Sequence, residues 1–288
     1  MADRTLFMVQ IGGPKRRTLS GALHSSYQHF LNDVKILEDI NVILPGASDA
    51  HSEKRLNEIH KRMEALDEEG KKQIRSFIEF RPKNLKDIKS KKADKPILRI
   101  VHKEAAVLLN QIVNHSILSF RIPALIREMS LVYLVISFEE FVAININNTF
   151  STLQGMISPG KTLEFEDIRD CRSKREIVDL MIEKEIDDIV HHGIDNTADR
   201  LSSILHFDLR KKPEWDKFRE VFYRRNLYVH HYGSPNLTYR KKINPIVQPG
   251  RLQIDKQYLD EAYRLFRLFA KNVDEGFQKY SSEGKRSK

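Results

Sequence analysis

The 288-residue sequence contains a single cysteine, Cys171. One cysteine cannot form a disulfide within the chain, and it excludes the zinc sites that are built from several thiolates. No uninterrupted apolar run of membrane-spanning length occurs, because Glu139 and Glu140 break the most apolar stretch, residues 130–146. The N-terminal residues contain no apolar segment of signal-peptide length. We therefore expect a cytoplasmic protein that does not span a membrane.

Two kinds of cofactor motif are also missing. The segment GGPKRR at residues 12–17 lacks the glycine and lysine spacing of a phosphate-binding loop. Adjacent histidines occur at residues 191–192 and 230–231, but adjacent residues point to different faces of a helix. No helix is expected to place two histidines one turn apart with an acidic residue, as a zincin would. The sequence therefore predicts no cofactor and no metal.

Basic residues are in clear excess, with 49 Lys and Arg against 40 Asp and Glu and a net charge of +9. A sequence pI of about 9.4 favours acidic partners, nucleic acid first. Residues 81–95 are basic, polar and poor in apolar side chains. This segment is interpreted either as a solvated linker or as an arm that holds RNA phosphates through Lys89, Lys91 and Lys92.

Apolar residues recur at helical spacing along most of the chain, and no strand-rich region or repeat period occurs. We expect an all-α protein, with a helical bundle at residues 96–288 and a smaller helical N-terminal region at residues 1–95. Residues 6–11 could form one short strand. Turns are predicted at Pro45-Gly46, near Gly70 and at residues 121–123. The expected helices cover residues 24–40, 52–66, 71–78, 96–120, 124–150, 166–191, 197–207, 215–232 and 255–280.

The helix that begins near Trp215 carries an unusual residue in its apolar stripe. Trp215, Phe218, Phe222 and Val229 fall at helical spacing, and Arg225 occupies the position between the last two. A guanidinium in an apolar stripe is costly unless an acceptor binds its N–H groups. Arginine can hold a phosphate with two donors, and the nearby His230 can transfer a proton near neutral pH. This helix is therefore the candidate site of phosphodiester chemistry.

The order Arg225, Asn226, His230 resembles the signature of the HEPN superfamily, an arginine followed four to six residues later by a histidine. The flanks are similar too, with a glycine after the histidines and then Asn236 and Tyr239. The resemblance covers roughly residues 108–277. The pairs Arg224 with His230, or Arg225 with His231, also satisfy the spacing. We prefer Arg225 and His230, because Asn226 then follows the arginine directly.

The HEPN resemblance implies a metal-independent endoribonuclease that uses the 2′-OH of RNA as its nucleophile. In such a site His230 moves a proton, Arg225 stabilises charge on phosphorus, and Asn226 orients the phosphate or His230. Family members often carry an acidic residue on an upstream helix, for which Glu140 is preferred here without excluding Glu139. The resemblance also implies a homodimer with a composite active site. Further supporting residues are His231 and Tyr239, and further RNA-binding residues are Arg224, Arg240 and Lys241.

Two other functions stay open at this point. A HEPN-like domain can bind RNA or a partner protein without cleaving anything. It can also act as the regulatory subunit of a nucleotidyltransferase-type antitoxin pair. For an active ribonuclease, the resemblance implies a toxin or effector in anti-phage or toxin–antitoxin defence, with an antitoxin or other regulatory protein as partner.

Overall fold

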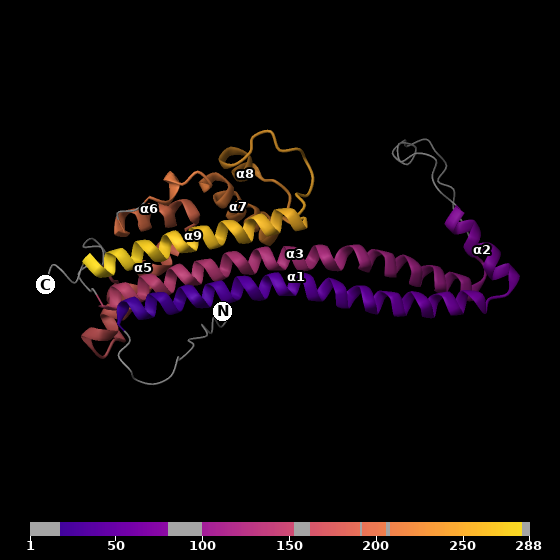
Figure 1. Ribbon diagram of the computed structural model, residues 1–288, viewed down its shortest axis with the longest axis horizontal. Helices are drawn as coiled ribbons and strands as arrows, with labels where there is room; N and C mark the ends of the chain where they lie inside the picture. Colours follow the sequence, from indigo (N-terminus) through magenta and orange to yellow (C-terminus); the bar gives the residue numbers. More distant parts are fainter. Residues whose placement is uncertain (1–17, 80–99, 153–161, 191, 206–207, 284–288) are drawn as a thin grey trace. The chain divides into compact units, whose positions relative to one another are not determined.

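The structure is a computed structural model that describes residues 18–79, 100–152, 162–190, 192–205 and 208–283 (Figure 1). Every regular element in these ranges is helical, which confirms the predicted all-α bundle. The strand expected at residues 6–11 lies outside the described residues. The α-helices are α1 (Leu19–Glu64), α2 (Glu68–Glu79), α3 (Lys103–Thr152), α4 (Phe165–Arg169), α5 (Lys174–Val190), α6 (Ile194–Leu205), α7 (Trp215–His231), α8 (Leu237–Lys242) and α9 (Lys256–Glu283); η2 (Leu209–Lys211) is a short 3₁₀ helix.

Two predicted turns are wrong, because α1 continues through Pro45 and α3 continues through Pro123. A proline inside a helix removes one backbone hydrogen bond and costs about 3 kcal/mol. Each helix carries buried apolar side chains on both sides of its proline, such as Leu109 and Leu131 in α3. Because each fully buried side chain of this size contributes about 1.5–3 kcal/mol, several together outweigh the proline.

Other helix ends also differ from the expected ones. The helix expected from Pro96 begins at Lys103, where the ring Nδ1 of His102 accepts the Ala105 N–H at 3.2 Å. The helix expected at residues 166–191 divides into α4 and α5, and the Ser173 Oγ accepts the Glu176 N–H at the start of α5. Side-chain acceptors at these starts satisfy N–H groups that have no partner within the helix.

The described residues belong to two compact units, which do not follow the boundary expected between residues 95 and 96. We call them the bundle unit, within Met1–Lys35, Leu131–Gln253 and Gln257–Lys288, and the hairpin unit, within Ile36–Ser130 and Ile254–Lys256. Both long helices cross the boundary between the units. Helix α1 passes from the bundle unit to the hairpin unit after Lys35, and α3 passes from the hairpin unit to the bundle unit after Ser130.

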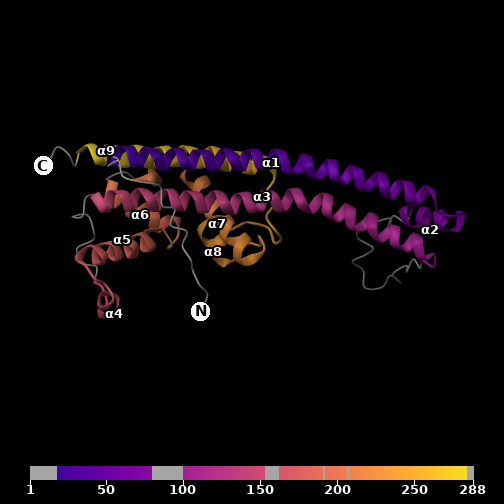
Figure 2. The same ribbon diagram turned by 90° about the horizontal axis from the view of Figure 1, so that it is seen from below.

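The bundle unit is built on an aromatic core that joins α1, α3, α7 and α9. Phe138 of α3 contacts Phe30 of α1, and Figures 1 and 2 show these two helices side by side. Phe218 of α7 stacks on Phe269 of α9 with ring centroids 4.0 Å apart. Because Phe138 also contacts Phe218 with centroids 5.3 Å apart, the core fixes α7 against α3. Apolar residues at helical spacing along α9 are buried in this core: Leu259, Tyr263, Phe266, Phe269 and Val273.

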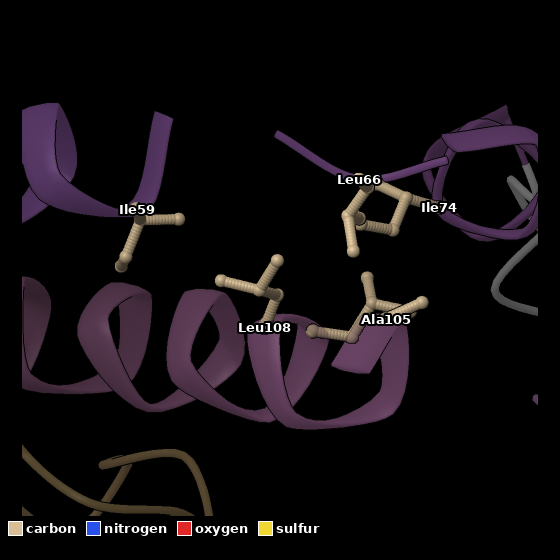
Figure 3. Packing of buried hydrophobic residues seen from close by; sticks show 6 residues of the cluster. Ile59, Leu66, Ile74, Ala105 and Leu108 are labelled. Carbon is tan, nitrogen blue, oxygen red and sulfur yellow. The ribbon is translucent and has the colours of Figure 1, made fainter. Parts of the chain in front are cut away.

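The hairpin unit has its own apolar core where α1, α2 and α3 meet. Ile59, Leu66 and Ile74 come from α1, the α1–α2 turn and α2, and they pack against Ala105 and Leu108 of α3 (Figure 3). Helix α1 ends at Glu64 and α2 begins at Glu68, so the chain turns close to the turn that was predicted near Gly70. Gly70 lies in the first turn of α2 instead of in the connection, because Asp67 caps the helix by accepting the Gly70 N–H at 2.8 Å.

Among the described residues, one helix, α3, is long and apolar enough to cross a membrane. However, 56% of its most apolar 18-residue segment is buried inside the protein. Residues 132–144 are apolar on nearly every side of this helix, and such a pattern predicts a central, buried helix. Its core face is buried as expected, but Tyr133 and Ile136 are 53% and 46% exposed. Helix α3 therefore has a defined outer face.

Candidate active site

The three predicted catalytic residues line one open pocket of about 500 Å³ in the bundle unit. Arg225, Asn226 and His230 come from α7. Asn226 and His230 are exposed and lie one helical turn apart, so they share a face. Predicted supporting residues His231 and Tyr239 line the same pocket. The volume falls within the range of about 300–1,000 Å³ that is usual for small-ligand sites.

Helix α7 is held by its apolar side and ends directly beside the pocket. Trp215, Phe218 and Phe222 are buried as predicted, whereas Val229 is 50% exposed and does not continue the core stripe. The helix stops where Tyr232 and Gly233 adopt positive φ values of 51° and 76°. Gly233 is required there, because a Cβ would lie 3.0 Å from the Tyr228 ring. His230 and His231 therefore lie in the last turn of a helix whose other side is packed in the core, and both side chains are exposed.

The acceptor for Arg225 is Glu139 of α3, which forms an ion pair with the guanidinium. The preferred residue Glu140 is exposed and does not line the pocket, so that choice is corrected. Successive helical residues are about 100° apart, and the buried Val135, Phe138 and Val142 define the core face of α3. Glu139 lies at the edge of that face and Glu140 lies behind it.

The guanidinium of Arg225 is mostly buried but keeps unused hydrogen-bonding capacity. The side chain is 19% exposed, and its Nε is buried without a hydrogen-bond partner. Glu139 is 20% exposed and binds the Nη2 end. An arginine carries five N–H donors in a planar fork. This guanidinium is therefore oriented by one carboxylate, and Arg225 lines the pocket with more N–H donors than Glu139 binds.

A second carboxylate, Glu220, organises the side of α7 next to the site. It accepts hydrogen bonds from the hydroxyls of Tyr239 and Tyr258, both at 2.6 Å, and from Arg224 Nε at 2.7 Å. Arg224 also lies over the Tyr258 ring, 4.0 Å from its centroid. This environment corrects the assignment of Arg224 to RNA binding, because its side chain is 16% exposed and is held by Glu220 and the Tyr258 ring. Tyr239 lines the pocket, but its hydroxyl is committed to Glu220.

The Glu220 network predicts a loss of stability in alkali. Burial, followed by the charge of Glu220, raises the pKa of Tyr239 and Tyr258 above the usual 10.0. The folded state then holds these protons more tightly than the unfolded state. The stability that these two tyrosines contribute should be constant below pH 10 and should be lost as the pH rises beyond 10.0. Urea denaturation of the wild type and of Tyr258→Phe between pH 8 and 11 tests this.

Tyr258→Phe should show a shallower decline above pH 10 than the wild type, because it has one fewer shifted tyrosine to ionise. It should also lose about 1.5–3 kcal/mol at neutral pH, the usual contribution of a hydrogen bond to a charged group. Equal slopes for the two proteins in the alkaline range would contradict the network as described.

Two further predicted RNA-binding residues, Arg240 and Lys241, lie on α8 and do not line the pocket. Arg240 donates to the Val247 carbonyl at 2.9 Å and so braces the loop after α8. Lys241 is exposed. Lys89, Lys91 and Lys92 lie outside the described residues. The connection between α7 and α9 contains the short helix α8, which Asn236 caps by accepting the Tyr239 N–H at 2.9 Å.

Sequence reasoning missed the residues that reach the pocket from the connection between α5 and α6. His192 and Gly193 line the pocket there. Next to them, Asp195 binds Arg219 at 2.5 and 2.8 Å and the Tyr223 hydroxyl at 2.8 Å. These hydrogen bonds keep the pKa of Asp195 below 3.8 although burial raises it. The double histidine at 191–192 is visible in the sequence, but only the fold brings His192 to the pocket that α7 lines.

Within the described ranges, no three His, Cys, Asp or Glu side chains are arranged to hold a metal ion. What the site offers is an oriented guanidinium, an exposed amide and exposed imidazoles around one pocket. Comparison with protein-family models, with curated proteins and with solved structures found no match for this chain.

Proposed function

We propose that this protein is an endoribonuclease that cleaves RNA by attack of the 2′-OH on the neighbouring phosphorus, as the HEPN-like motif implies. The observation that carries the proposal is the convergence of Arg225, Asn226 and His230 on one open pocket. A guanidinium, an amide and an imidazole suit this reaction, since it moves protons and accumulates negative charge on phosphoryl oxygens.

In the proposed mechanism His230 removes the proton from the 2′-OH as the O2′–P bond forms. Arg225 donates hydrogen bonds to the phosphoryl oxygens, whose charge grows in the transition state. The Glu139 carboxylate holds the guanidinium in one orientation, and Asn226 binds the phosphate next to His230. The P–O5′ bond then breaks, and the products are a 2′,3′-cyclic phosphate and a 5′-hydroxyl.

Single-stranded RNA is the proposed substrate. Its backbone can rotate until the 2′-oxygen, the phosphorus and the leaving 5′-oxygen lie in line, which an A-form helix prevents. Its unpaired bases are also free to bind protein side chains. The net charge of +9 attracts the phosphate backbone.

A homodimer is proposed as the working form. Exposed apolar side chains stand next to the site residues, with Val229 at 50%, Tyr232 at 86% and Leu237 at 75% exposure. Large apolar side chains left exposed beside a site are suited to contact with another protein. A second copy of the same surface, related by a two-fold axis, would cover them and place two sites near each other.

The proposal is tested by incubating the wild type with mixed tRNA and mRNA in the presence of EDTA. We expect fragments that end in a 2′,3′-cyclic phosphate and a 5′-hydroxyl, and a particle of twice the 33.7 kDa chain mass by light scattering. RNA that is bound but never cut would favour the alternative, a HEPN-like module that binds without cleaving.

A further inference from the structure

The proposed reaction needs two proton transfers on opposite sides of the phosphorus. One proton leaves the 2′-oxygen while the O2′–P bond forms, and another must reach the 5′-oxygen while the P–O5′ bond breaks. An unprotonated nucleoside alkoxide is a poor leaving group, so a general acid on the leaving side accelerates the second step. One imidazole cannot occupy both sides of an in-line arrangement at once, so His230 alone does not complete the site.

Histidine 192 reaches the same pocket from a different element of the bundle unit. It lies in the connection between α5 and α6, next to Gly193, whose φ of 89° turns the chain there. The connection is anchored, because the Thr197 hydroxyl donates to the Ile189 carbonyl at 2.7 Å. Ile189 and Ile194 are buried on either side of the turn. The imidazole is exposed, so RNA can reach it.

The hydrogen bonding of His192 determines which ring nitrogen can transfer a proton. Its Nδ1 lies 3.2 Å from the Asp188 carbonyl oxygen. A carbonyl oxygen only accepts hydrogen bonds, so Nδ1 must carry a hydrogen in this contact. The proton that His192 can transfer is then the one on Nε2. This is the arrangement by which a backbone carbonyl commonly fixes the tautomer of a functional histidine.

Two other groups in the pocket are less suited to the leaving side. His231 follows His230 directly on α7 and therefore comes from the same helix end as the proposed base. The Tyr239 hydroxyl donates to Glu220, and its pKa is raised by burial and then by that carboxylate. A tyrosine that holds its proton this tightly is a weak acid.

We infer that His192 is the general acid of the site. This inference rests on the proposed ribonuclease function and gives that reaction its second proton-transfer group. His230 takes the 2′-OH proton, and Nε2 of His192 gives its proton to the departing 5′-oxygen. Both histidines end the step in the opposite protonation state, and solvent exchange resets them.

The inference is tested with two uridine 3′-phosphodiesters that differ only in the leaving group. In uridylyl-3′,5′-uridine the leaving group is a nucleoside, which needs a proton. In uridine 3′-(4-nitrophenyl phosphate) it is nitrophenolate, a much weaker base that leaves without one. His192→Ala should slow cleavage of the first substrate by about 10²–10⁴-fold and should leave the second within a few-fold of the wild type.

His230→Ala should slow both substrates, because the 2′-OH must lose its proton in either case. His51→Ala, at an exposed histidine of the hairpin unit, is the matched control and should behave as the wild type. His192→Gln keeps a polar side chain of similar length and should show the same selective loss as His192→Ala.

The other outcomes contradict either the role of His192 or the ribonuclease proposal, and the rates on the two substrates distinguish these cases. Wild-type rates for His192→Ala on both substrates would overturn it while leaving the ribonuclease proposal intact. An equal loss on both substrates would make His192 a binding residue and would also overturn it as the acid. A wild type that cleaves neither of these diesters nor the mixed RNA would overturn the proposed function itself.

Discussion

Replacing His230 with alanine is expected to lower the rate of RNA cleavage by about 10²–10⁴-fold, the usual contribution of a general base. Arg225→Ala is expected to lower it by about 10²–10³-fold, because the guanidinium is the oriented cationic donor facing the pocket. The measurement is the initial rate on a fluorescently labelled single-stranded RNA with EDTA present. His230 is exposed, so its loss should leave the fold unchanged.

Arg225→Lys separates charge from geometry at the same position. A lysine keeps the positive charge but presents a single ammonium instead of a planar fork of donors. It should remain able to pair with Glu139 but should recover only a small part of the wild-type rate. Full recovery would mean that positive charge alone suffices, and the bidentate role assigned to Arg225 would be wrong.

Matched controls come from the same residue types outside the pocket. Arg264 is 51% exposed and paired with Glu261, and His60 is 70% exposed beside Glu64. Arg264→Ala and His60→Ala should each retain the wild-type rate. If they reduced cleavage as much as Arg225→Ala and His230→Ala do, the loss would reflect general electrostatics and not the pocket.

Phe218→Ala should produce the largest loss of stability. The Phe218 side chain is fully buried, and its ring contacts those of Phe138, Trp215, Phe222, Phe266 and Phe269. Truncating a buried phenylalanine to alanine costs about 3–5 kcal/mol, since apolar contact is lost and a cavity remains. A typical domain has only about 5–15 kcal/mol of net stability. We therefore expect a bundle unit that is severely weakened.

The measurement can be restricted to the bundle unit, because the single tryptophan, Trp215, lies in its aromatic core. Urea denaturation followed by tryptophan fluorescence should show a much lower midpoint for Phe218→Ala. The control is Phe165→Ala in α4, where the same side chain is 77% exposed and should change stability by no more than about 0.5 kcal/mol. Similar midpoints for the two variants would contradict the core described above.

Glu139 illustrates what the sequence could not resolve at the site. Helical spacing placed Arg225 in an apolar stripe, and this required an acceptor from another element. Residues 132–142 are apolar on nearly every side of α3, so periodicity alone does not tell which side is buried. The choice between Glu139 and Glu140 depends on the rings of Phe218 and Phe266, which pack on Phe138 from helices far along the chain.

Arg224 is a second residue whose surroundings could not be predicted from the sequence. Its position beside Arg225 in a basic stretch predicts an exposed phosphate contact. In the structure, Glu220 and Tyr258 enclose it, and its Nη1 donates to the Gln253 carbonyl at 3.2 Å. A side chain's availability depends on the partners that tertiary packing brings to it, and Tyr258 lies 34 residues away in sequence, on α9.

The sequence by itself determined the helical class and the placement of Arg225, Asn226 and His230 at the end of one helix. These follow from local spacing and from residues such as Gly233, which act within a few positions of the backbone. The tertiary structure alone decided that α1 and α3 pass through their prolines, that Glu139 pairs with Arg225, and that His192 joins the pocket. The physical reason is that burial and charge pairing depend on neighbours from distant segments, whereas helix formation depends mainly on neighbours in the chain.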